Sequence, residues 1–223
     1  VLVFEGTYDG NLVLSKDLLL LAMSGPSNTE ILANTGSAIM VTGVGDSTRV
    51  QGFSFDGLGS ASAGIDVVGC NPTLSDCVVR GASSGGRFRS GATPDVVRTT
   101  FAENTYGIET QDTASPRLIS NTFYGQSAAN IMNSGSVGPI VGGSLESAND
   151  FLDNAYFHVF NTGTAMISAE FNWWSDDCPD STWFSGDVDW SPWTDETHTL
   201  TMTECGTGVD DGVPLRPALR DNY

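Results

Sequence analysis

The chain has 223 residues, enough for one sizeable hydrophobic core, and carries 27 acidic against 9 basic side chains, a formal net charge of −18. This balance argues against nucleic acid and anionic membrane as partners, because both bind through basic surface. No run of eighteen apolar residues occurs, so we expect no insertion into a membrane.

The chain begins with the apolar residues Val1, Leu2, Val3 and Phe4, which predict a strand without a capping helix before it. Further short apolar runs predict buried strands at residues 11–14, 18–21, 29–32 and 38–42. Open edges of apolar strands recruit other chains, so we expect residues 1–4 to form one half of an assembly interface. The alternative is that a cap has been trimmed from this end.

A repeat of 22 to 23 residues organises the middle of the chain, marked by prolines at positions 72, 94, 116 and 139. Apolar residues keep step with the prolines: Leu74 with Val96 and Leu118, Val79 with Phe101 and Phe123, and Ile108 with Ile131. Such a repeat indicates a solenoid, in which each unit buries its apolar face against its neighbours. Period-two alternation predicts strands as the repeated element. We therefore expect an all-β, parallel β-helix of roughly seven turns of about 22 residues.

The least regular repeat contains Arg87 and Arg89 where an apolar strand is expected. Residues two apart on a strand point to the same face, so both arginines should project outward while Phe88 points inward. Paired guanidinium groups can hold the carboxylate of an acidic sugar, which makes them candidate ligand contacts. The alternative is that they pair with acids on neighbouring turns, such as Asp66 and Glu109.

All five tryptophans lie between residues 173 and 193. Large rings cover much apolar area, which favours a plug over the C-terminal end of the solenoid; the alternative is an aromatic platform for sugar rings. We expect Trp183, Trp190 and Trp193 to form the other half of the assembly interface. Contacts between unlike ends do not close, so they generate filaments.

Acidic residues stand among these tryptophans, namely Asp176, Asp177, Asp180, Asp187 and Asp189. Oxygen ligands at this density suit Ca²⁺, which makes calcium the one cofactor to consider. Their order matches neither an EF-hand loop nor a calcium-binding nonapeptide repeat. The simpler interpretation is an acidic solvated surface, since fourteen acids and no Lys or Arg occur between Glu146 and Asp211.

The repeat resembles the right-handed parallel β-helix of the pectate-lyase-like superfamily, in particular its class of secreted repeat proteins. Residues 1–8 are similar to the first-turn phrase of such domains, and residues 172–174 and 186–193 are similar to their closing phrase. The resemblance implies a domain over residues 1–203 with a Trp-rich C-terminal cap. Residues 204–223 then form a linker and a tail, and residues 213–223 resemble the lead-in to a bacterial C-terminal sorting domain. Together these features imply a secreted or cell-surface protein.

Four cysteines allow three pairings. In an exported protein we expect Cys178 to pair with Cys205, which fastens the tail to the solenoid, and Cys70 to pair with Cys77. The alternative for Cys70 and Cys77 is that both are buried free thiols that fill repeat positions.

The residues required for catalysis are not grouped in any recognisable way. A pectate-lyase-type mechanism needs acidic calcium ligands near a basic residue; Arg80, Arg98 and Arg117 are candidates beside Asp76, Asp95 or Asp112, and nothing singles out one group. Glycoside hydrolysis needs paired carboxylates, for which the adjacent pair Asp176 and Asp177 lies in the end plug. A serine triad would use His158 or His198. His158 directly follows Phe157 on a predicted strand, so the two side chains should point to opposite faces. We therefore expect His158 to point outward or into a satisfied polar contact.

We therefore expect a non-enzymatic structural β-solenoid on the cell surface, whose copies assemble end to end into a filament. The first alternative is a carbohydrate-binding or adhesive β-helix, which the tryptophan cluster, Tyr106 and Tyr124 favour. The second alternative is a calcium-dependent polysaccharide lyase. The fold alone does not distinguish these three functions, because the same architecture hosts many functions.

Overall fold

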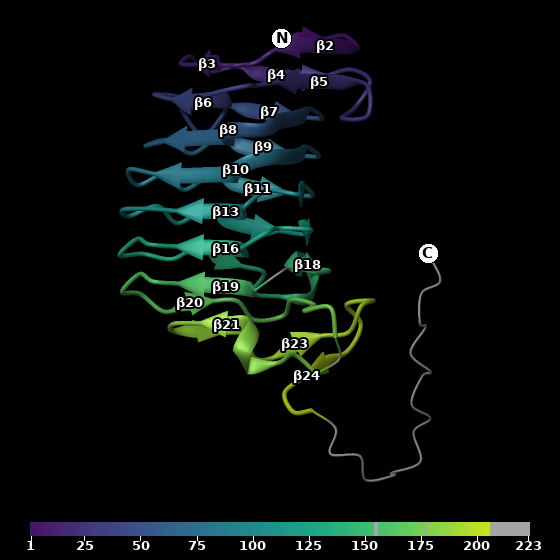
Figure 1. Ribbon diagram of the computed structural model, residues 1–223, viewed down its shortest axis with the longest axis vertical. Coiled ribbons are helices and arrows are strands. Elements are labelled where there is room, and N and C mark those ends of the chain that lie inside the picture. The colour runs from purple at the N-terminus through teal and green to yellow at the C-terminus, as the bar shows by residue number, and fades with distance from the viewer. Residues whose placement is uncertain (154–155, 177, 206–223) are drawn as a thin grey trace.

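The computed structural model describes residues 1–153, 156–176 and 178–205. The described chain winds into a β-solenoid of about eight turns with almost no helix, with the N-terminus at one end and the last strands at the other (Figure 1). The prediction of a parallel β-solenoid is confirmed. The structure has about eight turns, where the sequence predicts roughly seven.

Each turn contributes to three stacks of parallel strands. The first stack contains β1 (Leu2–Val3), β4 (Leu19–Ala22), β7 (Arg49–Gln51), β9 (Thr73–Ser75), β11 (Asp95–Val97), β14 (Arg117–Ile119), β17 (Ile140–Val141), β20 (Ile167–Ser168) and β22 (Val188–Asp189).

The second stack contains β2 (Gly6–Asp9), β5 (Thr29–Leu32), the first parts of β8 (Ser54–Val68) and β10 (Val78–Arg89), β12 (Thr100–Ala102), β15 (Thr122–Tyr124) and β18 (Asp150–Phe151). The third stack contains β3 (Leu12–Leu14), β6 (Ser37–Thr42), the last parts of β8 and β10, β13 (Tyr106–Thr110), β16 (Ala129–Asn133), β19 (Phe157–Asn161) and β21 (Phe184–Ser185). Two short 3₁₀ helices, η1 (Leu145–Ser147) and η2 (Ser181–Trp183), and a terminal hairpin of β23 (Trp193–Thr194) and β24 (Thr201–Met202) complete the described chain.

The register aligns the apolar residues that the repeat predicts to be equivalent. Leu74 is opposite Val96, which is opposite Leu118, and Phe101 is opposite Phe123 in the next turn. All five side chains are fully buried. The core is therefore a set of columns of like residues that run along the solenoid axis, as expected for parallel strands whose alternate side chains point inward.

Aromatic rings form the most continuous of these columns. Phe101, Phe123, Phe151 and Trp174 stack in succession, with ring centroids 5.2, 4.8 and 4.3 Å apart. Stacked aromatic pairs add to the free energy gained from burying their area. This column links the middle of the solenoid directly to its C-terminal end.

Buried asparagines close one corner of successive turns. The Asn149 side-chain oxygen accepts from the Asn121 backbone N–H at 2.8 Å, and its amide nitrogen donates to the Leu118 carbonyl at 3.0 Å. The Asn172 oxygen in turn accepts from the Asn149 N–H at 2.9 Å. Because an unpaired buried backbone group is costly, each amide supplies the partners that its turn lacks.

His158 lies inside the solenoid, 1% exposed, with Nδ1 2.9 Å from the Asn130 amide. The predicted satisfied polar contact is present, and the alternative of an outward side chain is wrong. Its neighbour Val159 is also buried, so the alternation of inward and outward side chains is interrupted at this point of β19. Burial lowers the pKa of His158 to about 4, so the ring is neutral at ordinary pH.

Candidate assembly interface at the solenoid ends

The N-terminal end of the solenoid is open in the described structure. Val1, Leu2 and Phe4 are exposed, and Val3 is half-buried against the core. β1 uses one edge to pair with β4, and no described strand pairs with its other edge. The half of the predicted interface at residues 1–4 is therefore accessible.

Core-facing columns also end uncovered at this face. Tyr8 is opposite Ile31, and Leu12 is opposite Ile39. Ile31 and Ile39 are buried, whereas Tyr8 and Leu12 are each 39% exposed because no described turn lies above them. We call the free edges of β1, β2 and β3, together with the side chains of Tyr8 and Leu12, the N-terminal face. It combines unpaired strand edges with apolar side chains that belong to a core.

The C-terminal end is closed by an aromatic plug. Trp174 and Trp193 are fully buried, while Trp183 and Trp190 are half-buried against the core. Phe184 stacks on Trp190 with ring centroids 4.9 Å apart, and Trp190 packs on Trp193 at 5.3 Å. The prediction that Trp193 presents itself for assembly is therefore corrected, because its indole is used inside the molecule.

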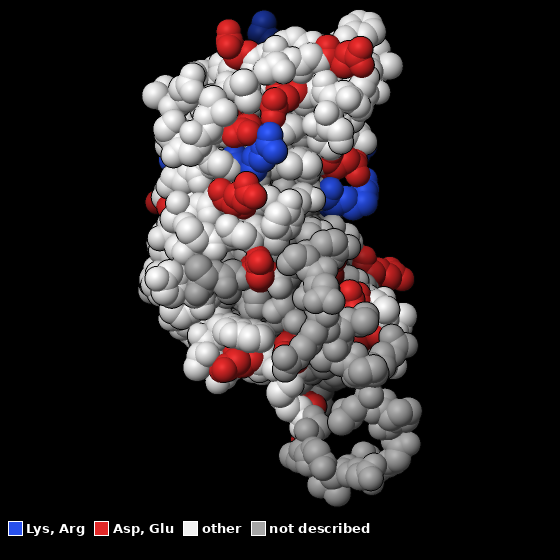
Figure 2. All heavy atoms as spheres, turned by 45° about the vertical axis from the view of Figure 1, so that its right-hand side comes forward, with Lys and Arg blue, Asp and Glu red and all other residues white. Residues whose placement is uncertain are grey.

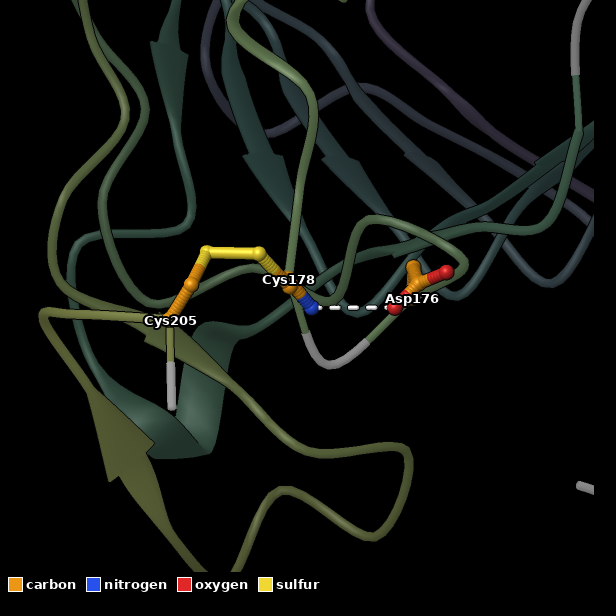
Figure 3. The surroundings of a disulfide bond; sticks show 3 residues. All are labelled: Asp176, Cys178 and Cys205. Carbon is orange, nitrogen blue, oxygen red and sulfur yellow. Dashed lines mark hydrogen bonds between the residues drawn. A yellow bond between two sulfur atoms is a disulfide. The ribbon is translucent and has the colours of Figure 1, made fainter. Parts of the chain in front are cut away.

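A disulfide between Cys178 and Cys205 fastens the last described residues to this plug, as predicted (Figure 3). The Asp176 carboxylate accepts from the Cys178 backbone N–H at 3.0 Å and holds the turn that carries the bond. Figure 3 shows the bond between Cys178 and Cys205, with Asp176 beside Cys178.

The tip of the same hairpin contacts the side of the solenoid. His198 Nε2 lies 2.9 Å from Asp150 Oδ1 on β18. Burial raises the pKa of the Asp150 carboxyl, and the neighbouring His198 opposes that shift. The sequence suggests His198 only as a member of a serine triad. The 47 residues between Asp150 and His198 hide their pairing, and only the fold reveals it.

The proposed metal ligands do not converge. Among the described residues, no group of three or more His, Cys, Asp or Glu side chains is placed to hold an ion. Asp176 and Asp180 instead accept from backbone N–H groups of their own turns, and Asp177 lies outside the described residues.

The acidic residues nevertheless give this end a distinct charge. Residues 118–215 contain 14 acids and no Lys or Arg. In Figure 2 the basic side chains, drawn in blue, lie in the upper part of the molecule. The charged side chains visible below them among the described residues are red, that is, acidic.

Arg87 and Arg89 point outward while Phe88 is buried, as their spacing predicts. Arg87 Nη2 lies 2.7 Å and Arg89 Nη2 3.2 Å from Asp66 Oδ2, and Asp66 is fully buried beneath them. Burial alone would raise the pKa of Asp66, but the two arginines lower it. The ladder interpretation is confirmed for Asp66. Glu109 instead accepts from Ser84 and Gln111.

The other arginines considered for catalysis are also in ion pairs between turns. Arg80 bridges Asp56 at 2.8 Å and Glu30 at 2.9 Å. The remaining pairs are Arg98 with Asp76 at 2.7 Å and Arg117 with Asp95 at 3.3 Å, while Asp112 accepts from the Ser90 N–H. These pairs connect successive turns along the outside of the solenoid.

Cys70 and Cys77 are free thiols in the core, so the predicted disulfide between them is wrong and the alternative is correct. Their Sγ atoms donate to backbone oxygens of Val41 at 3.4 Å and Ser75 at 3.2 Å. Burial raises the pKa of Cys77 to about 11. Both residues occupy core positions as small apolar side chains.

A hollow of about 500 Å³ lies beside the second stack near the N-terminal end. Thr7, Asn28, Glu30, Ser54 and Arg80 line it with hydroxyl, amide and charged groups.

No protein family, curated protein or solved structure matches this chain. In the described part, neither helix has the length or apolar character to cross a membrane. The predicted tail from residue 206 onward lies outside the described residues.

Proposed function

We propose that the protein is a non-enzymatic, extracellular or cell-surface structural β-solenoid that associates with other copies of itself through the N-terminal face. The observation that carries this proposal is the exposure of Tyr8 and Leu12, which continue buried core columns and are covered by no described turn. Covering them with strands of another copy removes apolar surface from water and pairs the free strand edges. Membership of the right-handed, pectate-lyase-like class and export through a C-terminal sorting signal belong to this proposal.

Further support comes from the side chains along the outside of the solenoid. Arg80, Arg87, Arg89, Arg98 and Arg117 all pair with carboxylates on adjacent turns. Charges used in this way stiffen the solenoid and are not poised to exchange protons with a substrate. A rigid solenoid whose N-terminal face binds another copy is suited to a structural role.

The test compares two neighbouring exposed residues of β3. Leu12 faces the core column at the N-terminal face, whereas Val13 is 65% exposed and alternates to the outer side. The mass of Leu12→Glu and Val13→Glu is measured against the unaltered chain by analytical ultracentrifugation over a range of concentrations. We expect Leu12→Glu to remain monomeric while Val13→Glu associates like the unaltered chain. A strictly monomeric unaltered chain at high concentration would overturn the proposal.

The polar hollow beside the second stack supports a second candidate, carbohydrate binding. Glu30, Asn28 and Arg80 offer the hydrogen-bonding groups that sugars require. A glycan-binding screen with Arg80→Ala as the comparison tests it: a ligand lost on substitution supports this function, and no ligand above background rejects it.

A further inference from the structure

The C-terminal edge of the second stack is covered by a short segment that folds back on itself. We call residues 195–205, which include β24, the C-terminal strap. β24 runs antiparallel to β23, with Met202 opposite Trp193 and Thr201 opposite Thr194. No other described strand pairs with β23, so the strap occupies the edge that another parallel turn would use.

Three contacts hold the strap. Cys205 is bonded to Cys178 at one end, and the His198 side chain reaches Asp150 at the tip. Between them, the Asp195 carboxylate accepts from the backbone N–H groups of Thr199 at 2.8 Å and Leu200 at 2.9 Å. The strap is therefore shaped by its own turn and attached to the solenoid at two separated points.

The geometry of the stacks shows what this segment excludes. The N-terminal face offers one strand to each stack, β1 to the first, β2 to the second and β3 to the third. At the other end, β22 and β21 are the last strands of the first and third stacks. β23 lies below the second stack, since the Thr194 N–H donates to the Asn172 carbonyl at 3.0 Å. A copy added head to tail would bring its β2 to the edge of β23, where β24 lies.

We propose that the C-terminal strap is an edge guard, which blocks the N-terminal face of a second copy from adding below β23. The inference rests on the proposed function, because the excluded occupant is another copy. With the strap in place, two copies meet only through their N-terminal faces, and such a contact between like surfaces closes as a dimer. With the strap released, unlike ends meet and growth continues as a filament.

The disulfide gives a direct way to release the strap. A dithiol reductant supplies two electrons and two protons: the Cys178–Cys205 bond breaks, two thiols form, and the reductant closes to its own disulfide. Cys70 and Cys77 are already thiols, so the same reagent leaves them unchanged.

The experiment follows assembly of the whole chain by ultracentrifugation and electron microscopy, with and without dithiothreitol. Cys205→Ser releases the same fastening without a reagent, and Met202→Pro disrupts β24 while keeping the disulfide. Cys70→Ser is the matched cysteine control. Tryptophan fluorescence and circular dichroism verify that the plug and solenoid of each variant remain folded.

We expect dimers from the oxidised chain and from Cys70→Ser, and filaments from the reduced chain, Cys205→Ser and Met202→Pro. Leu12→Glu placed in the Cys205→Ser background should abolish the filaments. Dimers that persist unchanged after reduction and in both strap variants overturn the guard but leave the proposed function standing. Filaments formed by the oxidised chain would also overturn the guard but leave the proposed function standing. Monomers under every condition overturn both.

Discussion

Trp174 stacks on Phe151 with 4.3 Å between ring centroids, and both side chains are fully buried. Phe151 thereby joins the C-terminal plug to the aromatic column that begins at Phe101. The plug is an extension of the repeat core. Removing a ring from this column should therefore destabilise the whole C-terminal half of the solenoid.

Replacing Phe151 by Ala removes the middle of this column. We expect the free energy of unfolding to fall by about 3–5 kcal/mol, the usual cost of deleting a buried phenylalanine ring. Denaturation with urea, followed by tryptophan fluorescence, measures the change. Tyr156→Ala is the control, because that ring is 69% exposed and its loss should cost little. Equal, small effects of the two substitutions would show that the aromatic column does not contribute to the free energy of unfolding.

Two aspartates with arginine partners differ in burial and in the number of those partners, which permits a ranking of their contributions. Asp66 is fully buried and faces two arginines, whereas the Asp76 side chain is 32% exposed and faces Arg98. Asp66→Asn should destabilise by about 1–3 kcal/mol, because two arginines lose their charged partner beneath the surface.

Asp76→Asn should cost less than about 1 kcal/mol, as expected of an exposed pair. Asp76 also has a φ of +55°, a conformation that Asn tolerates as well as Asp, so the backbone adds no penalty. Urea denaturation at low and moderate salt measures both variants. A larger loss for Asp76→Asn than for Asp66→Asn contradicts the ranking.

The cysteine assignment predicts the reactivity of the native chain. Cys70 and Cys77 are buried thiols, and burial raises the pKa of both, so the reactive thiolate is scarce and shielded. Ellman's reagent should find no thiol in the native, non-reduced protein and two after denaturation without reductant. Peptide mapping should then recover Cys178 joined to Cys205. Two rapidly reacting thiols in the native state would place one of the pair at the surface.

The parts of the fold that depend on repetition were predictable from the sequence. Leu74, Val96 and Leu118 recur at fixed spacing, and stacking of like residues is the only way for short strands to bury them. Arg87 and Arg89 were likewise placed on the outer face by alternation alone. Such features are local, because each follows from the spacing of neighbours along the chain.

At the end of the repeat the sequence predicts the Cys178–Cys205 bond and the tryptophan plug, but it does not predict which side chains are used inside the molecule. Trp193 looks the same in sequence whether it faces a partner or its own core, and only the path of the chain after Trp190 decides. Cys70 and Cys77 are close enough in sequence to suggest a bond, yet the strands between them direct their side chains into separate backbone contacts. The contact of His198 with Asp150 has no local signature at all.

The buried histidine predicts how stability depends on pH. His158 has a pKa of about 4 in the folded protein, below its ordinary value of 6.5, so the unfolded chain binds the proton more readily. Stability contributed by the neutral ring is complete above pH 6.5 and declines as the pH falls toward 4. The full loss is about 3 kcal/mol, from a shift of some 2.5 pH units at 1.36 kcal/mol each.

Urea denaturation between pH 7 and pH 4 measures this dependence in the unaltered chain and in His158→Gln. We expect His158→Gln to be less stable at pH 7 but to lose much less stability on acidification. Asp66 and Asp76, whose pKa values are lowered, begin to lose their contribution as the pH falls toward their ordinary value of 3.8, and this loss is common to the unaltered chain and His158→Gln. Burial raises the pKa of Asp150, which acts with the opposite sign and is common to the unaltered chain and His158→Gln. An unchanged slope in His158→Gln would show that the ring is not held neutral in the core.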